Sequence, residues 1–376
     1  MRQLFFSALL LATSFSSIAQ TPVSGRKIQV AILFDTSNSM DGLIDQAKSR
    51  IWNIVNEIGT LKHNGQSPIM EFAVYQYGND GLEMSDNYIQ LVQDLTSDMD
   101  DLSASLFGLK TNGGSEFCGA VIEKSLDDLA WSPSTNDLKM IYIAGNESFS
   151  QGPIDYKEVC KIALKREIFI NTIHCGSYEQ GVSHFWKDGA TIGGGDYYNI
   201  DSDKAIAHID TPYDQEIQTY NDSVNSTYYG YGSIGIRKKE MQLSEDANAA
   251  SQAGAVMTER AITKSKSSTY SNSSWDMIDA VNEGKDISEM DEDELPEEFK
   301  NLSDEDKKAK VDSINLDRKR FQDKISDLSV ERQNYIDEEM KKKAEAGEVD
   351  DFGTSVNDGI IKRAKEVGLV KESDDE

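Results

Sequence analysis

Basic residues are scarce in this chain of 376 residues. It has 38 lysines and arginines against 66 aspartates and glutamates, which gives a formal net charge of -28 at pH 7. Nucleic acids and anionic membrane surfaces are negatively charged as well, so the chain is not expected to bind either of them. Cations and basic proteins are the partners that this charge favours.

Cysteine and histidine are few. The three cysteines are Cys118, Cys160 and Cys175, and the four histidines are His63, His174, His184 and His208. Either two of the cysteines form a disulfide in an oxidising compartment, with the pair undetermined, or all three are buried small apolar residues. The histidines show no H-E-x-x-H or other close ligand spacing, so they are not expected to bind zinc.

The usual catalytic and nucleotide-binding motifs are missing too. There is no Ser/His/Asp order, no dinucleotide fingerprint and no paired-carboxylate signature, and residues 193–195 lack the lysine and hydroxyl of a phosphate-binding loop. We therefore predict no catalytic residues. The one enzymatic hypothesis, in which Asp35 or Glu147 activates a metal-bound water, ranks below the binding hypotheses.

The N-terminus has the pattern of an export signal. Arg2 precedes a mostly apolar run over residues 4–12, and residues 17–19 are the small residues that a signal peptidase needs. We predict that residues 1–19 are a removed secretory signal, which makes the mature protein periplasmic or secreted, without a transmembrane segment. The alternative is a retained anchor, although the run is shorter than the about 20 residues that span a bilayer.

Strand and helix patterns alternate between residues 27 and 229. We expect strands at 27–34, 68–77, 88–95, 140–144, 168–174 and 196–200, and helices at 44–58, 97–106, 121–129 and 155–166. The strand at 27–34 is almost continuously apolar, as in a sheet covered on both faces. Regular alternation predicts an α/β fold with a doubly wound, mostly parallel six-stranded sheet, whose ligands bind beyond the carboxyl ends of the strands.

The composition changes after residue 233 and predicts a separate α-helical C-terminal region. We expect an Ala/Ser-rich helical and linker region at 230–285, a solvated acidic linker at 286–301 and a helical, partly coiled-coil-like region at 302–376. The last region has a heptad seam made of Val311, Ile314, Arg318, Phe321, Ile325, Leu328, Arg332 and Tyr335. Its two arginines favour packing against the Ala-rich helix, or a short helical hairpin, over a long dimeric coiled coil.

A D-x-S-x-S motif, Asp35 to Ser39, follows the first apolar strand directly. Its one carboxylate and two hydroxyls are hard oxygen donors, of the kind that bind Mg²⁺ or Ca²⁺ while leaving positions for water. The alternative is that Asp35 and Ser39 only cap the turn from strand to helix.

This motif, the Gly113-Gly114-Ser115 loop and the polar end of the strand at 140–144 together resemble the von Willebrand factor type A domain, over residues 26–229. The resemblance implies a metal-ion-dependent adhesion site, built by three loops at the top of the sheet, where a partner's carboxylate often completes the shell of a divalent cation. Residues 193–198, 211–214 and 225–228 also look like a bacterial secreted subgroup without an assigned activity.

Carried over residue by residue, the resemblance gives an incomplete metal site. Asp35, Ser37 and Ser39 match fully, and Ser115 stands where the family usually has threonine. In the third loop, where the family has T-D-G, this chain has Ala144-Gly145-Asn146-Glu147, so Gly145 or Asn146 takes the place of the aspartate. Cation binding is then weaker unless Glu116 or Glu147 contributes. The predicted metal ligands are Asp35, Ser37, Ser39, Ser115, Asn146 and Glu147.

Two functional hypotheses follow. The first is an exported, non-catalytic binding protein that recognises an acidic side chain of a protein partner through a bound Mg²⁺ or Ca²⁺ ion. The second is a structural scaffold that self-associates through its C-terminal helices and has a weak or vestigial metal site.

Overall fold

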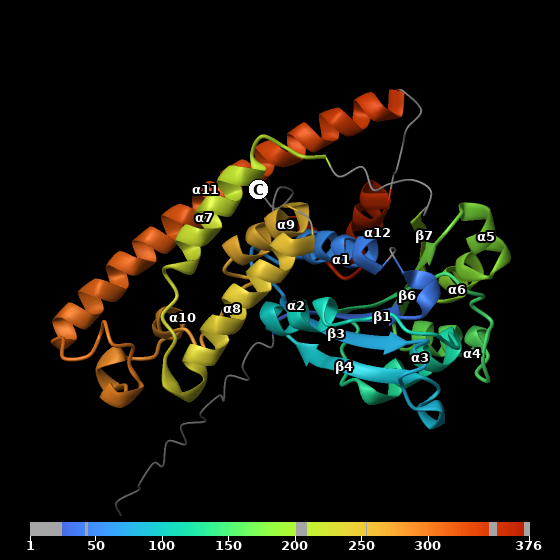
Figure 1. The fold of residues 1–376 in the computed structure, drawn as a ribbon, viewed down its shortest axis with the longest axis horizontal. Coiled ribbons are helices and arrows are strands. Elements are labelled where there is room, and N and C mark those ends of the chain that lie inside the picture. Colours follow the sequence, from blue (N-terminus) through green and yellow to red (C-terminus); the bar gives the residue numbers. More distant parts are fainter. Residues whose placement is uncertain (1–24, 42–43, 201–208, 253, 346–351, 372–376) are drawn as a thin grey trace, which may run out of the picture.

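The computed structural model describes residues 25–41, 44–200, 209–252, 254–345 and 352–371. Figure 1 shows an α/β unit with helices on both faces of one sheet, beside an arm of helices that includes the long α11. The predicted signal, residues 1–19, lies outside the described residues. No helix in the described part of the chain is long and apolar enough to cross a membrane.

The sheet has six strands in the order β4-β3-β1-β5-β6-β7. The strands are β1 (Lys27–Asp35), β3 (Ile69–Tyr77), β4 (Ile89–Thr96), β5 (Leu138–Gly145), β6 (Ile168–Cys175) and β7 (Gly194–Ile200). All neighbouring pairs are parallel except β3 and β4. The prediction of a doubly wound, mostly parallel six-stranded sheet is therefore confirmed.

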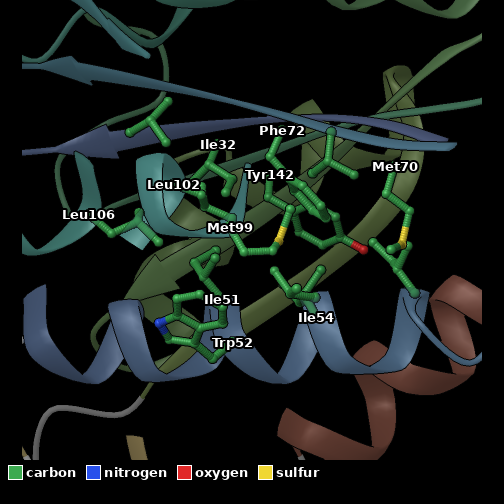
Figure 2. Packing of buried hydrophobic residues seen from close by; sticks show 14 of the residues in the cluster. Ile32, Ile51, Trp52, Ile54, Met70, Phe72, Met99, Leu102, Leu106 and Tyr142 are labelled. Carbon is green, nitrogen blue, oxygen red and sulfur yellow. The ribbon is translucent and has the colours of Figure 1, made fainter. Parts of the chain in front are cut away.

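Two apolar cores cover the two faces of the sheet. In β1, Val30 and Ile32 enter the core that includes the side chains of α1 (Ile44–Ile58) and α2 (Met99–Phe107). Figure 2 shows Ile51, Trp52 and Ile54 of α1 packed below the sheet in this core. Ala31 and Leu33 enter the other core, which contains side chains of α3 (Cys118–Asp128), α4 (Tyr156–Lys165) and α6 (Trp186–Ile192). Burial on both sides explains why β1 is apolar along its length.

The helical C-terminal region follows the sheet, as predicted, but its last segment returns to it. Helix α12 (Phe352–Glu366) packs against α1 and β7, and Val356, Ile360 and Ala364 belong to the same core as Ile32. Strand β8 (Val370–Lys371) then pairs with β2 (Leu61–Lys62), the short strand after α1. Residues from the far end of the chain thus complete one face of the α/β unit.

Along the chain, β7 and α12 are separated by the helices α7 (Asp214–Asn225), α8 (Gly232–Gln252), α9 (Gly254–Ser265), α10 (Met277–Asn282) and α11 (Asp304–Glu345). The heptad seam of α11 packs against α7 and α9 of the same chain. Its two arginines are buried in ion pairs, Arg318 with Asp276 and Asp279, and Arg332 with Asp214 and Glu259. Packing against the Ala-rich segment, as predicted from these arginines, therefore occurs within one molecule.

The acidic stretch 286–301 is not the solvated linker that its charge predicted. It forms two short 3-10 helices, η3 (Ile287–Glu289) and η4 (Glu292–Glu294), capped by Asp286 and Asp291. Ile287, Leu295 and Phe299 are buried in a small core with Met277, Ile278 and Val311. These spaced apolar residues bury enough surface to order a segment whose acids stay in solvent.

Of the two alternatives for the cysteines, the structure shows the second: all three are buried and free. Cys118 and Cys160 lie in the core on the α3 side of the sheet, whereas Cys175 lies in the core on the opposite side. The structure agrees with the alternative that cysteine serves as a small apolar residue here.

Candidate metal centre

The D-x-S-x-S loop begins where β1 ends and turns into the 3-10 helix η1 (Asn38–Met40). Because β1 and β5 are parallel neighbours, the loop after β5 meets this loop at the same edge of the sheet. The segment 111–117 between α2 and α3 joins them there. Its backbone is held by hydrogen bonds from Asn38 N to Gly113 O, 3.0 Å, and from Asn112 N to Thr36 O, 2.9 Å.

Asp35 is fully buried under this loop. Its Oδ1 accepts a hydrogen bond from the backbone N of Ser37 at 2.8 Å, whereas its Oδ2 is buried without a hydrogen-bond partner. Burial raises the pKa of Asp35 to about 7, against the lowering effect of the hydrogen bonds from Ser37. A buried carboxylate oxygen without a partner is costly and rare, so this atom is a candidate ligand position.

The serines of the motif are linked to the third loop. Ser37 Oγ lies 2.7 Å from Ser39 Oγ, and Ser39 Oγ donates to Oδ1 of Asn146 at 3.0 Å. In return, the Asn146 side-chain amide donates to the backbone O of Ser39 at 3.0 Å. Of the two candidates for the third-loop position, Asn146 is thus the one that contacts the motif.

Packing disfavours a side chain at position 145, because Tyr77 would have to move to admit one. A Cβ built on Gly145 would lie 2.7 Å from the Tyr77 hydroxyl and 3.1 Å from Cβ of Asp35. The Tyr77 hydroxyl is itself fixed, since it donates to the backbone O of Ala144 at 3.0 Å. Tyr77 therefore fills the space beside Asp35 that a side chain at 145 would need.

The second loop comes close to the first, but Ser115 is not bonded to it. A Cβ on Gly114 would overlap the backbone O of Gly78 and lie 3.0 Å from Cβ of Ser37, so the loops are in direct contact. Ser115 itself is half-buried. Among the described residues, no hydrogen bond joins Ser115 to Asp35, Ser37 or Ser39.

The acid that follows Ser115 is more deeply placed. Glu116 is only 7% exposed, and its pKa is raised by burial and by the nearby acids Glu147 and Asp80. Glu147 is half-buried, and its backbone O accepts a hydrogen bond from Trp186 Nε1 at 2.7 Å. The sequence suggested Glu116 only as an alternative ligand, and its position directly after Gly-Gly-Ser is what places it near the first loop.

His174 contacts the backbone of the third loop. His174, at the end of β6, is fully buried, and its Nε2 lies 3.3 Å from the backbone O of Asn146. Burial lowers its pKa to about 4, so the ring is neutral at pH 7. A carbonyl only accepts, so this contact requires the proton on Nε2. His174 therefore supports the backbone of the third loop through this hydrogen bond.

The donors at this edge suit a hard cation. Within the described residues, no group of three or more His, Cys, Asp or Glu side chains could hold a metal ion. What is present is one buried carboxylate with a free oxygen, two adjacent hydroxyls and an amide oxygen. Mg²⁺ and Ca²⁺ accept such neutral oxygens and keep water in the remaining positions. The residues therefore fit such an ion, with few charged ligands.

Known proteins resemble this chain in structure but not in sequence. No protein-family model and no curated protein sequence matches it. Among solved structures, BatB from Bacteroides thetaiotaomicron is 16% identical with a TM-score of 0.36, covering 46% of this chain and 90% of its own. The SpRpn10 VWA domain is 19% identical with a TM-score of 0.34, covering 46% and 87%.

A third similar structure is proximal thread matrix protein 1 from the mussel byssus, described with a zinc-occupied MIDAS motif. It is 14% identical with a TM-score of 0.36, and the match covers 48% of this chain and 43% of that one. At these identities the likeness concerns the fold alone. In strand order and in the position of its D-x-S-x-S loop, the chain has the von Willebrand factor type A fold.

Proposed function

We propose that this chain is an exported, non-catalytic binding protein, which recognises an acidic group of a protein partner through a divalent cation. Asp35, Ser37 and Ser39 would hold the ion, with Asn146 and Ser115 beside them. The single observation that carries the proposal is the buried, unpartnered Oδ2 of Asp35 next to the paired hydroxyls of Ser37 and Ser39.

Charge and chemistry favour this use of the site. A divalent cation held by one protein carboxylate keeps a net positive charge, and one held by two carboxylates is neutral. In both cases the ion keeps water-filled positions into which a partner carboxylate can enter. Without the ion, a chain with a net charge of -28 repels acidic groups. The cation therefore makes binding of an acidic partner conditional on metal.

The scaffold hypothesis gains no support from the helices. The seam residues Val311, Arg318, Ile325 and Arg332 are each 4% exposed or less, because they face other helices of the same chain. A second copy could reach these positions only after α11 had left its own molecule.

A partner-capture experiment tests the proposal. Immobilised wild type and Asp35→Ala are exposed to solubilised envelope proteins of the producing cell, in Mg²⁺, in Ca²⁺ and in EDTA. We expect wild type to retain at least one protein in the presence of metal and to release it in EDTA. Asp35→Ala should not retain this protein under any of the three conditions. Glu123→Ala, which removes an exposed acid of α3, is the control for lost negative charge and should behave as wild type. Identical retention by Asp35→Ala would contradict the proposal.

A further inference from the structure

The third loop leaves the metal site short of one carboxylate. Gly145 cannot accept a side chain without displacing Tyr77, and Asn146 contributes a neutral amide that is already bonded to Ser39 on both sides. The backbone O of Glu147 accepts a hydrogen bond from Trp186, and among the described residues no hydrogen bond joins Glu147 to Asp35. A hard divalent cation with Asp35 as its only acid would bind weakly, since affinity follows the charge of the ligands.

A second acid does lie beside Asp35, and it comes from the second loop. A Cβ built on Gly78 would lie 2.9 Å from Oδ1 of Asp35 and 2.9 Å from Cγ of Glu116. The two acidic side chains thus flank the same glycine, where any larger residue would push them apart. The backbone of Gly78 is held by a hydrogen bond to Tyr88 O at 3.1 Å and has a φ of +73°, a conformation that glycine adopts without strain.

Glu116 is buried in a position that needs a cation. Its side chain is nearly inaccessible, and the charges that act on it are those of other acids, with Glu147 and Asp80 the strongest. None of the ion pairs formed by the described residues neutralises Glu116 or Asp35. Two adjacent buried acids without a basic partner are unfavourable in each other's presence, and a divalent ion between them relieves this repulsion.

We propose that Glu116 supplies the second carboxylate of the metal site, in place of the third-loop aspartate that the chain lacks. This inference rests on the divalent cation of the proposed function.

Titration with Mn²⁺, followed by the electron paramagnetic resonance signal of the free ion, tests this directly on the full chain. Glu116→Gln should weaken Mn²⁺ binding about 10- to 100-fold. Glu147→Gln, and Glu123→Gln on the exposed side of α3, should stay within about twofold of wild type. Thermal melts in EDTA provide a second readout: Glu116→Gln should melt no lower than wild type, because it removes a charge that is buried beside Asp35.

The outcomes separate this inference from the one it rests on. If wild type binds no Mn²⁺, both are overturned. If binding depends on Asp35 but Glu116→Gln retains wild-type affinity, or if Glu147→Gln alone loses it, only the role of Glu116 is overturned. If Glu116→Gln fails to fold, Glu116→Asp, which keeps the charge on a shorter side chain, should show a measurable loss of affinity; wild-type affinity in that variant would overturn the inference.

Discussion

Ser39 and Asn146 hold each other by two reciprocal hydrogen bonds, one from hydroxyl to amide oxygen and one from amide nitrogen to backbone oxygen, both 3.0 Å long. They come from two loops that are far apart in sequence and follow neighbouring strands of the sheet. This pair fixes the third loop against the D-x-S-x-S loop through a neutral side chain.

Asn146→Asp should therefore strengthen cation binding. A third-loop carboxylate adds a charged oxygen next to Ser39, so we expect the Kd for Mg²⁺ or Ca²⁺ to fall about tenfold. Asn38→Asp, which adds the same charge to an exposed position of the first loop, is the control for a general electrostatic effect. Equal gains in both variants would show that the position of the added acid does not matter.

Asp35 should make the metal-free protein less stable at higher pH. Its folded-state pKa of about 7 lies above the ordinary value of 3.8, so between these two values the folded state holds a proton that the unfolded state has lost. The free energy of unfolding then falls as pH rises through this window, by up to about 4 kcal/mol.

Asp35→Asn isolates this contribution, because an amide keeps the acceptor for Ser37 N but cannot ionise. In EDTA, the variant should be more stable than wild type at pH 8, and the difference should shrink toward pH 5, as measured by urea unfolding at each pH. A constant difference across this range would contradict the buried, unpaired state of the carboxylate.

Helix α12 should be essential to the α/β unit although it follows it by more than a hundred residues. Ile360 is fully buried in the sheet core, so Ile360→Ala should lower the free energy of unfolding by about 2–5 kcal/mol. Leu316→Ala is the control, because Leu316 is 73% exposed on α11 and should change stability by less than about 0.5 kcal/mol. Similar small effects in both would mean that α12 does not pack on the sheet.

Arg318 should anchor α11 to its own chain. Its guanidinium pairs with Asp276 at 2.9 Å and Asp279 at 2.6 Å and lies over the ring of Tyr228, so Arg318→Ala leaves these two acids without a cationic partner. We expect a loss of about 3–5 kcal/mol in chemical unfolding. Arg320→Ala, two residues away, removes an exposed i,i+3 pair with Asp317 and should cost less than about 1 kcal/mol.

The sheet could be predicted from the sequence because its signals are local. The apolar run that ends at Asp35 and the turn before the antiparallel strand β4 each specify their own segment. The destination of α12 could not be predicted in this way. Its apolar face, with Val356 and Ile360, predicts only that the helix is covered on this side. Helix α1, which packs against it, lies at the other end of the chain.

The arrangement of the candidate site could be predicted in part for a similar reason. The D-x-S-x-S spacing is local, and the structure brings Ser39 and Asn146 together as strand order requires. Burial is a tertiary property, so the sequence could not rank Glu116 above Glu147 or indicate that Tyr77 blocks position 145. The prediction of a solvated linker at 286–301 failed for the same reason, because the burial of Leu295 and Phe299 orders the segment in spite of its charge.

Calorimetric titration of MgCl₂ and CaCl₂ into the full chain at pH 8, where Asp35 is ionised, tests the central claim most directly. We predict one binding site per chain in wild type and a loss of at least about 100-fold in affinity in Asp35→Asn. Absence of binding to wild type at millimolar cation, or equal affinity in the two proteins, would contradict a metal site at the D-x-S-x-S loop.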